Sequence, residues 1–278
     1  MTRSTGDRAC PECGAIFRRG YLRCPIDGAE LHDFTTDPLE GRTLQGRYVI
    51  DHFVGGGANG RVYAARHVRL DRRYAVKVLY GDLAADPTMR GRFEREAEAA
   101  SKLQHPNVVP VIDAELAGRG LCYMVMDFVE GPTLESRLQV EGVWPEKRAI
   151  DVLRQLASGL EHAHRHGLVH RDLKPDNILF TAADSDHARI TDFGVAWVAA
   201  PVRGPALTRP GDLVGTPGYM APEQLLGKSV DARTDLYALG MVGYRMVLGR
   251  HPFGGSEVEL LDAALDHAVP PLSKLGID

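Results

Sequence analysis

The sequence predicts an α+β protein in which a β-rich part precedes a larger helical part. Three observations support this prediction. Segments rich in β-branched and aromatic residues dominate residues 45–130, helical periodicity dominates residues 131–278, and three of the four cysteines fall within the first 24 residues. With 44% hydrophobic and 25% charged residues, the 278-residue chain has a globular composition. We therefore expect a small Cys-rich module over 1–33, a linker over 34–44 and a main domain over 45–278.

Charge and hydropathy exclude several classes of partner. The formal net charge of −4 forces no basic face, so we expect no nucleic-acid partner. No apolar run approaches the roughly 18 residues that a membrane-spanning helix needs, and the N-terminus lacks the apolar core of a secretory signal. We expect no membrane segment in this chain and a cytoplasmic location.

The Cys-rich module contains a short pseudo-repeat. Residues 10–14 (CPECG) are echoed fourteen positions later by residues 24–28 (CPIDG). Clustered cysteines in a reducing compartment favour metal binding over disulfides. Cys122 stands alone in an apolar stretch and is expected to be a small buried hydrophobic residue. Residues 34–43 carry Pro, Gly and acidic groups without periodicity, which is typical of a linker.

Strands and one helix are expected in the first half of the main domain. The strand-like segments are residues 48–54, 61–66, 74–79 and 121–129. A helix should begin after Asp86, which suits the N-cap position, with Pro87 in its first turn. Its inward positions recur at helical spacing: Met89, Phe93, Ala97, Ala100 and Leu103.

Helices dominate after Gly131. Pro145 opens an amphipathic helix whose apolar stripe comprises Ala149, Val152, Leu156, Leu160 and Ala163. Residues 234–248 are apolar nearly all round, which predicts a helix buried on most sides.

A glycine-rich segment lies between the first two strands. Residues 55–62 (GGGANGRV) fit the pattern G-x-G-x-x-G-x-V. Glycines let a backbone approach phosphate oxygens closely, although the same residues also suit a plain hairpin loop. A strand follows this segment, whereas a dinucleotide-binding motif would be followed by a helix.

Lys77 alternates with Val76 and Val78, so its side chain should face opposite to theirs and could reach phosphates beneath the glycine loop. Glu96 lies on the apolar stripe of the predicted helix. An inward carboxylate needs a cation, and we expect Lys77 to be its partner. The alternative, a solvated helix carboxylate, suits Glu94 and Glu98 better.

Residues 170–177 (HRDLKPDN) carry the strongest chemical signal. Asp172 can accept a hydroxyl proton, Lys174 can neutralise a phosphoryl group, and Asn177 can hold a metal ion. Asp192, followed by Phe193 and Gly194, supplies a second oxygen ligand suited to Mg²⁺ bound with nucleotide phosphates. Residues 221–223 (APE) follow at a loop's distance.

Together and in this order, these motifs resemble those of the bacterial, eukaryotic-like Ser/Thr protein kinases. The resemblance implies a bilobal fold, with a β-rich N-lobe over 45–130 and a helical C-lobe over 131–278. It also implies that ATP and Mg²⁺ are cofactors and that the γ-phosphoryl group passes to Ser or Thr hydroxyls of proteins. Asp172 would take the hydroxyl proton, and Lys77, paired with Glu96, would contact the nucleotide phosphates.

The resemblance further implies a nucleotide-binding set. Its members are Val54, Gly55, Gly57, Gly60, Val62, Ala75, Lys77, Met126, Asp127, Val129 and Leu179. Met126 would be the gatekeeper, and backbone groups of Asp127 and Val129 would bind the adenine edge. Asn177 and Asp192 would hold Mg²⁺.

Specificity and regulation are implied by four positions. Lys174 and Thr216, the latter in Gly215–Tyr219, match the Ser/Thr form of the family. Arg171 marks enzymes whose activation loop is ordered by a phosphate paired to that arginine. Thr208 is the expected autophosphorylation site, and the alternative is an ordinary exposed threonine. If phosphatase treatment leaves activity unchanged, this regulatory hypothesis is wrong.

The N-terminal module resembles the zinc ribbons attached to many bacterial kinases. Cys10, Cys13, Cys24 and Asp27 would hold Zn²⁺, with Asp27 where a cysteine is usual and His32 as a substitute within reach. The alternative is a degenerate ribbon without metal. Because thirty-odd residues bury little core, loss of the metal should disorder the segment.

The C-lobe departs from the family pattern. No arginine follows His251, so Glu223 should lack its usual arginine partner, and the lobe looks truncated. Either the sequence is a fragment or the lobe is short. The short lobe favours one alternative to the kinase assignment, a catalytically weak or inactive scaffold. A second alternative is a small-molecule phosphotransferase, which can share an H-x-D loop.

Overall fold

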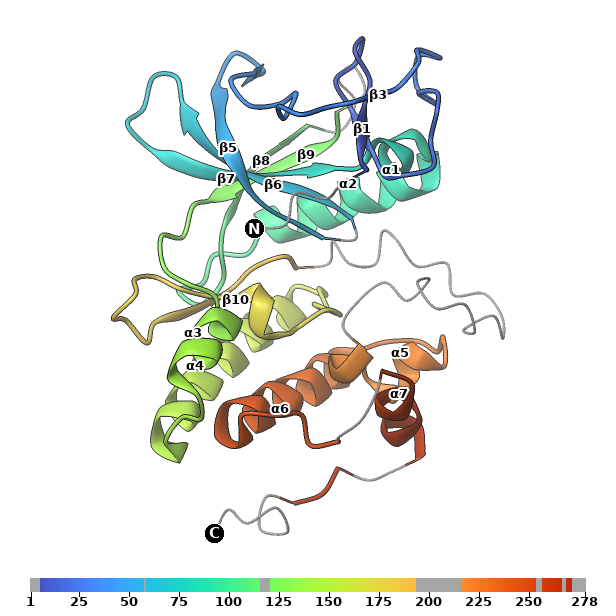
Figure 1. Cartoon of the computed structure of the whole chain (residues 1–278). Coiled ribbons are helices and arrows are strands. Elements are labelled where there is room, and N and C mark those ends of the chain that lie inside the picture. The colour runs from blue at the N-terminus through green and yellow to red at the C-terminus, as the bar shows by residue number, and fades with distance from the viewer. Residues whose placement is uncertain are drawn as a thin grey trace. The chain divides into compact units, whose positions relative to one another are not determined.

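The computed structural model describes residues 6–57, 59–115, 121–193, 217–253, 257–266 and 269–271 (Figure 1). These residues form two compact units. The first contains described residues of the ranges 1–102 and 110–128, and the second contains residues 103–109 and the described residues from Val129 onward. The chain passes between the units after Lys102, Val109 and Phe128.

The first unit is built on a six-stranded antiparallel sheet of order β4-β5-β6-β7-β9-β8. Its strands are β4 (Thr43–Leu44), β5 (Tyr48–Gly57), β6 (Gly60–His67), β7 (Arg73–Leu79), β8 (Val111–Glu115) and β9 (Tyr123–Asp127). Helices α1 (Gly81–Ala85) and α2 (Pro87–Ser101) complete this part of the unit. A smaller sheet of order β2-β1-β3 comprises β1 (Arg8–Ala9), β2 (Ile16–Phe17) and β3 (His32–Asp33).

The predicted start of α2 is confirmed. Asp86 is the N-cap, and its carboxylate accepts hydrogen bonds from the backbone N–H groups of Thr88 (2.7 Å) and Met89 (3.2 Å). All five predicted inward residues, from Met89 to Leu103, are buried. The three predicted strands before α2 are also present, as β5, β6 and β7.

Residues 34–44, predicted as a linker, are packed against the sheet. Leu39 is fully buried. The Gly41 N–H donates to the Ile50 carbonyl at 2.8 Å, and the Glu40 carboxylate accepts from the Phe53 N–H at 3.1 Å. Local sequence carries no sign of this packing, because these partners lie nine and thirteen residues apart along the chain.

The second unit is mainly helical. Its elements are α3 (Leu134–Glu141), α4 (Glu146–Arg165), the 3₁₀ helix η1 (Pro175–Asn177), β10 (Ile178–Phe180), β11 (Ala188–Ile190), the 3₁₀ helix η3 (Pro217–Tyr219), α5 (Pro222–Leu225), α6 (Ala232–Leu248) and α7 (Glu257–Asp266). The predicted stripe of α4, from Ala149 to Ala163, is buried throughout. Strands β10 and β11 pair antiparallel, and α4 packs against α6.

Helix α6 differs from its prediction. Leu236 is 54% exposed, so the helix is not buried on nearly all sides. The buried side begins instead with two polar residues, Thr234 and Asp235, each 1% exposed. Both have polar partners in this unit, and their inward orientation turns Leu236 to the opposite side of the helix.

Candidate active site and metal centre

The loop between α4 and β10 gathers three predicted catalytic groups. Lys174 Nζ lies 3.0 Å from Asp172 Oδ2. Asn177 Nδ2 donates to the backbone carbonyl of Asp172 at 2.7 Å and to its Oδ2 at 3.1 Å. Because the amide nitrogen of Asn177 is engaged in this way, its amide oxygen is the atom that can bind a cation. The predicted association of these three residues is therefore present within the second unit.

His170 connects this loop to the segment that carries Asp192. The imidazole is fully buried. Its Nδ1 accepts from the Asp172 N–H at 3.2 Å, which leaves Nε2–H to donate to the Thr191 carbonyl at 2.8 Å. The ring also meets the Phe193 ring edge-on, with centroids 4.8 Å apart. Through these two hydrogen bonds the His170 ring links the predicted base to the segment that carries the predicted metal ligand.

Asp192 has a φ angle of +63°, in the left-handed region. A non-glycine residue adopts this conformation at a cost in free energy, and strained residues of this kind cluster at functional sites. Arg171 is similar, with a φ angle of +69°.

Asp235, on α6, anchors the loop that carries Asp172. Its carboxylate accepts from the backbone N–H groups of His170 and Arg171, both at 2.8 Å, and lies 2.7 Å from His164 Nε2. Gln224 adds a further contact, because its Nε2 donates to the Arg171 carbonyl at 2.8 Å. Sequence analysis missed both residues. The available signal for Asp235 was a lone carboxylate in an otherwise apolar helix.

Glu223 has a partner other than the arginine of the family pattern. Its carboxylate accepts a hydrogen bond from Thr234 Oγ1 at 2.6 Å. This bond joins α5 to α6 within the second unit.

In the first unit, several predicted nucleotide-binding residues share one face of the sheet. Val62 lies opposite Lys77, which lies opposite Met124, and Ala75 lies opposite Met126. Directly paired residues point to the same face, as do residues two apart along a strand. Val62, Ala75, Lys77 and Met126 therefore lie on a common face. Glu96 is half-buried on α2, whereas Glu94 and Glu98 are exposed, as predicted.

Other predicted nucleotide-binding residues occupy the ends of the strands. Asp127, at the end of β9, donates its N–H to the Pro110 carbonyl at 3.1 Å, so its carbonyl is the only backbone group that it can offer to a ligand. Val129 follows Phe128 at the start of the second unit. Val54 is 43% exposed on β5, and Leu179 is half-buried on β10.

The glycine segment has one glycine that the fold requires. A Cβ atom at Gly60 would overlap with the backbone carbonyl of Val78 on the neighbouring strand. At Gly55 and Gly57, by contrast, a Cβ atom would meet nothing within 4 Å. Packing in the described residues thus explains Gly60, while Gly55 and Gly57 leave open space beside the hairpin.

The two Cys-containing turns of the N-terminal segment have the same backbone geometry. In the first, the Cys10 N–H donates to Ala15 O (2.9 Å) and the Gly14 N–H to Cys10 O (3.0 Å). In the second, the Cys24 N–H donates to Ala29 O (2.8 Å) and the Gly28 N–H to Cys24 O (2.9 Å). The pseudo-repeat is therefore structural, and Asp27 occupies the position that Cys13 has in the first turn.

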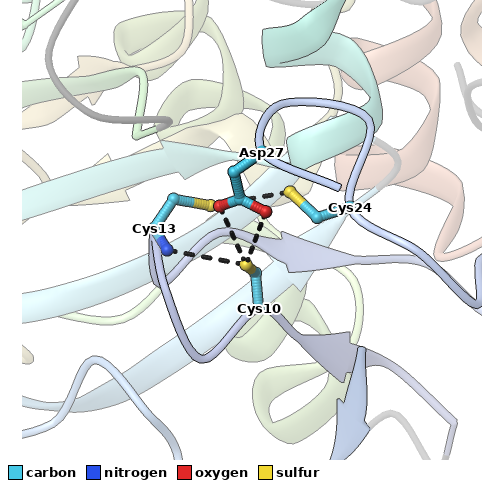
Figure 2. A group of neighbouring side chains, drawn as sticks. All are labelled: Cys10, Cys13, Cys24 and Asp27. Carbon is cyan, nitrogen blue, oxygen red and sulfur yellow. Dashed lines mark hydrogen bonds between the residues drawn. The ribbon is translucent and has the colours of Figure 1, made fainter. Parts of the chain in front are cut away.

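The turns bring four potential ligands together (Figure 2). The ligand atoms of Cys10, Cys13, Cys24 and Asp27 all lie within 4.8 Å of one another. The Cys13 and Cys24 sulfurs are 3.7 Å apart, and Asp27 Oδ2 lies 3.2 Å from Cys10 Sγ. A tetrahedral Zn²⁺ with bonds of about 2.3 Å places its sulfur ligands about 3.8 Å apart. The donor set fits a zinc ion, and His32 lies outside it.

The environment of the cluster lowers the pKa of its carboxyl group and raises the pKa of two of its thiols. The Ala29 backbone N–H, 3.0 Å from Oδ1, lowers the pKa of Asp27 to about 2. Burial raises the pKa of the Cys13 and Cys24 thiols. Asp27 is thus an anion at neutral pH and can contribute charge to a metal site.

Three further predictions lie outside the described residues: Gly194, Thr208 and Thr216. Cys122 is buried at 4% exposure, as predicted. Among the residues that the structure describes, no helix combines the length and the apolarity needed to cross a bilayer.

Comparison with known proteins identifies the class of protein that this fold and loop define. The protein kinase domain model matches residues 48–270, and the chain therefore belongs to the protein kinase family. The crystal structure of the PknI kinase domain of Mycobacterium tuberculosis superposes with a TM-score of 0.63 at 32% identity, covering 77% of this chain and 78% of that one. The bilobal kinase fold predicted from the motifs is confirmed.

The curated relatives are bacterial Ser/Thr kinases. The serine/threonine-protein kinase pkn2 of Myxococcus xanthus is 40% identical over 83% of this chain and 29% of its own length. The serine/threonine-protein kinase PknB of Mycobacterium tuberculosis is 42% identical over 76% of this chain and 34% of its own length. The chain thus spans about a third of the length of these two relatives.

Proposed function

We propose that this protein is an ATP- and Mg²⁺-dependent protein kinase that transfers the γ-phosphoryl group to Ser or Thr hydroxyls. The observation that carries the proposal is the geometry of the loop at Asp172, where Lys174 and Asn177 both contact its carboxylate. Support also comes from the family match and from relatives named serine/threonine-protein kinases.

Each group of the loop has a role that its contacts support. Asp172 would orient the acceptor hydroxyl and take its proton. Lys174, 3.0 Å from that carboxylate, would offset negative charge on the transferring group. The amide oxygen of Asn177 and the carboxylate of Asp192 would hold Mg²⁺, which neutralises phosphate charge when bound.

Residues of the first unit would bind the nucleotide. Lys77, on the same sheet face as Val62 and Ala75, would contact the α- and β-phosphates and pair with Glu96. The Asp127 carbonyl and a backbone group of Val129 would bind the adenine edge, with Met126 as the gatekeeper. The open space beside Gly55 and Gly57 would let the hairpin backbone approach phosphate oxygens.

An Asp192→Asn variant tests the nucleotide and metal assignment. We expect its affinity for ATP in the presence of Mg²⁺ to fall about tenfold or more, because the substitution removes the charge that holds the ion. Affinity for ATP without Mg²⁺ should change little. Calorimetric titration with and without Mg²⁺ measures both quantities. Equal Mg²⁺ dependence in the variant and the wild type would contradict the assignment.

A small-molecule phosphotransferase remains the alternative that needs a direct test. Thr216 and the APE segment, residues 221–223, favour protein acceptors. An assay of generic protein acceptors against aminoglycoside-like small molecules distinguishes the two activities. Transfer only to the small molecules would exclude the protein kinase assignment.

We also propose that Cys10, Cys13, Cys24 and Asp27 bind one Zn²⁺. The support is the close grouping of the ligand atoms, all within 4.8 Å of one another, and the structural equivalence of the two turns. We expect about one equivalent of zinc per chain in purified protein, and about a tenfold or greater loss of zinc occupancy in Cys24→Ser. Elemental analysis and thermal unfolding measure the effect. Cys122→Ser, which changes a buried cysteine outside the cluster, is the matched control and should retain the metal.

A further inference from the structure

The sheet of the first unit has a second face, opposite to the one that carries Lys77. Because side chains alternate along a strand and match across paired strands, this outer face comprises Arg61, Tyr63, Val76, Val78, Tyr123 and Val125. The Cys-rich segment covers it. Ile16, Phe17 and Leu31 join the other five of these sheet residues, without Arg61, in one continuous hydrophobic core. A Cβ atom at Gly81 would overlap with the Phe17 ring, so the fit between segment and lobe is close.

The polar centre of this contact is Arg61, which directly follows Gly60 in the glycine segment. Its guanidinium is buried, with 7% of the side chain exposed. Nη1 lies 3.1 Å from Asp7 Oδ2, and Nη2 lies 2.7 Å from Asp37 Oδ2. The Arg61 guanidinium also lies over the Phe53 ring of β5, 4.3 Å from its centroid. One cation therefore bridges both strands of the hairpin to two carboxylates that lie outside the main sheet.

Two phenols complete the cluster. The Tyr63 hydroxyl donates to Asp37 at 3.1 Å and the Tyr80 hydroxyl to Asp7 at 3.4 Å. Burial raises the pKa of Tyr63, and it raises the pKa of Tyr80 to about 12, so both hydroxyls remain protonated donors at neutral pH. The Asp7 and Asp37 side chains are only 5% and 8% exposed.

Buried ion pairs of this kind set geometry more than they add stability. The free-energy cost of removing water from the charges offsets much of their attraction, whereas loss of one partner leaves an uncompensated buried charge. Arg61 makes a forked contact with both carboxylates, which fixes its position and direction. Gly60 precedes Arg61 and belongs to the glycine hairpin, which is the turn that joins β5 to β6. Among the residues that the structure describes, a side chain at Gly55 or Gly57 of this hairpin would have no packing neighbours.

We propose that Arg61, held by Asp7 and Asp37, is a positioning residue that fixes the base of the glycine hairpin for nucleotide binding. The N-terminal segment, which carries Asp7, then contributes to nucleotide binding through Arg61. This inference rests on the proposed function, because it assigns the hairpin to the phosphates. A merely structural cluster would alter stability alone.

The test compares variants of two ion pairs made by β6, which are Arg61 with Asp37 and Arg66 with Asp51. Asp37→Asn removes a charge from the cluster at nearly constant shape, and Arg61→Lys keeps the charge but removes the fork. The matched control is Asp51→Asn, which breaks the exposed contact of Arg66 with Asp51 (2.8 Å) at the other end of β5 and β6. We expect the two cluster variants to raise the KM for ATP and the dissociation constant of MgADP about fivefold or more, with kcat within about twofold. The control should match the wild type.

A second readout needs no nucleotide. Amide hydrogen exchange over residues 53–61 should be faster in Asp37→Asn and Arg61→Lys than in the wild type and in Asp51→Asn. Each protein is measured at a temperature the same number of degrees below its own thermal midpoint, so that differences in global stability do not enter the comparison. Unchanged exchange in both cluster variants would overturn the proposal. Unchanged MgADP affinity in a cluster variant that is folded would also overturn it. If the wild type binds no nucleotide, the proposed function fails, while the exchange data still decide whether Arg61 positions the hairpin.

Discussion

Asp172→Asn is expected to reduce phosphoryl transfer by about 10²- to 10⁴-fold while leaving ATP binding largely intact. Asparagine keeps the shape of aspartate, so the contacts with Lys174 and Asn177 can persist in altered form. It cannot accept the proton of an acceptor hydroxyl. Initial rates of γ-phosphoryl transfer and calorimetric ATP affinity measure the two effects separately.

Asp184→Asn provides the matched control for that substitution. Asp184 is exposed and lies in the turn between β10 and β11, away from the catalytic loop in sequence. Its replacement should leave both transfer and ATP affinity unchanged. An Asp172→Asn protein with normal turnover would refute the assignment of the general base.

Asp235→Asn is expected to damage both stability and catalysis, although Asp235 lies on α6 and not in the catalytic loop. The carboxylate accepts from two backbone N–H groups and contacts His164. Asparagine has one acceptor oxygen where aspartate has two. Its NH₂ group would therefore face the backbone N–H of His170 or of Arg171, and both of these groups are donors. Leaving one buried donor unsatisfied costs about 1–3 kcal/mol of the free energy of unfolding.

The lost hydrogen bond should also lower activity, because the two backbone N–H groups belong to His170 and Arg171, which directly precede Asp172. We expect kcat to fall about tenfold or more, since displacement of Asp172 by a fraction of an ångström weakens proton transfer. Thermal unfolding and initial rates measure the two effects. The neighbouring Leu236→Ala, at an exposed position, is the control. If Asp235→Asn equals the wild type in both measurements, the anchor has no catalytic role.

The side chains proposed as catalytic could be picked out from the sequence because they lie in short, ordered motifs. Asp172, Lys174 and Asn177 fall within six residues, so the local chain alone brings them close together. The strands and α2 were equally accessible, because alternation and helical spacing are local patterns. Asp86 and Pro87 marked the helix start for the same reason.

The residues that sequence analysis missed act over long sequence separations. Asp235 meets the catalytic loop 64 and 65 positions away. Arg61 meets Asp7 at a separation of 54 and Asp37 at a separation of 24. No local pattern marks such pairs, and Asp37 lay in a segment whose composition predicted only a linker. The expectation that the N-terminal segment depends on metal alone therefore omitted the core that it shares with the sheet.

The choice between Asp27 and His32 as the fourth metal ligand could not be made from the sequence alone either. Sequence placed both within reach of three cysteines. The structure brings Asp27 into the cluster because the second turn repeats the hydrogen bonds of the first, which fixes the fourth position of each turn as a ligand position. His32 lies on β3 and is exposed.

The most direct test of the kinase assignment is incubation of the full chain with Mg²⁺ and ATP labelled at the γ-phosphate, together with a generic protein acceptor, followed by phosphoamino-acid analysis. The proposed function predicts label on serine or threonine, abolished by removal of Mg²⁺ and by Asp172→Asn. Absence of label on protein from a folded, ATP-binding wild type, or label that persists in Asp172→Asn, would contradict it.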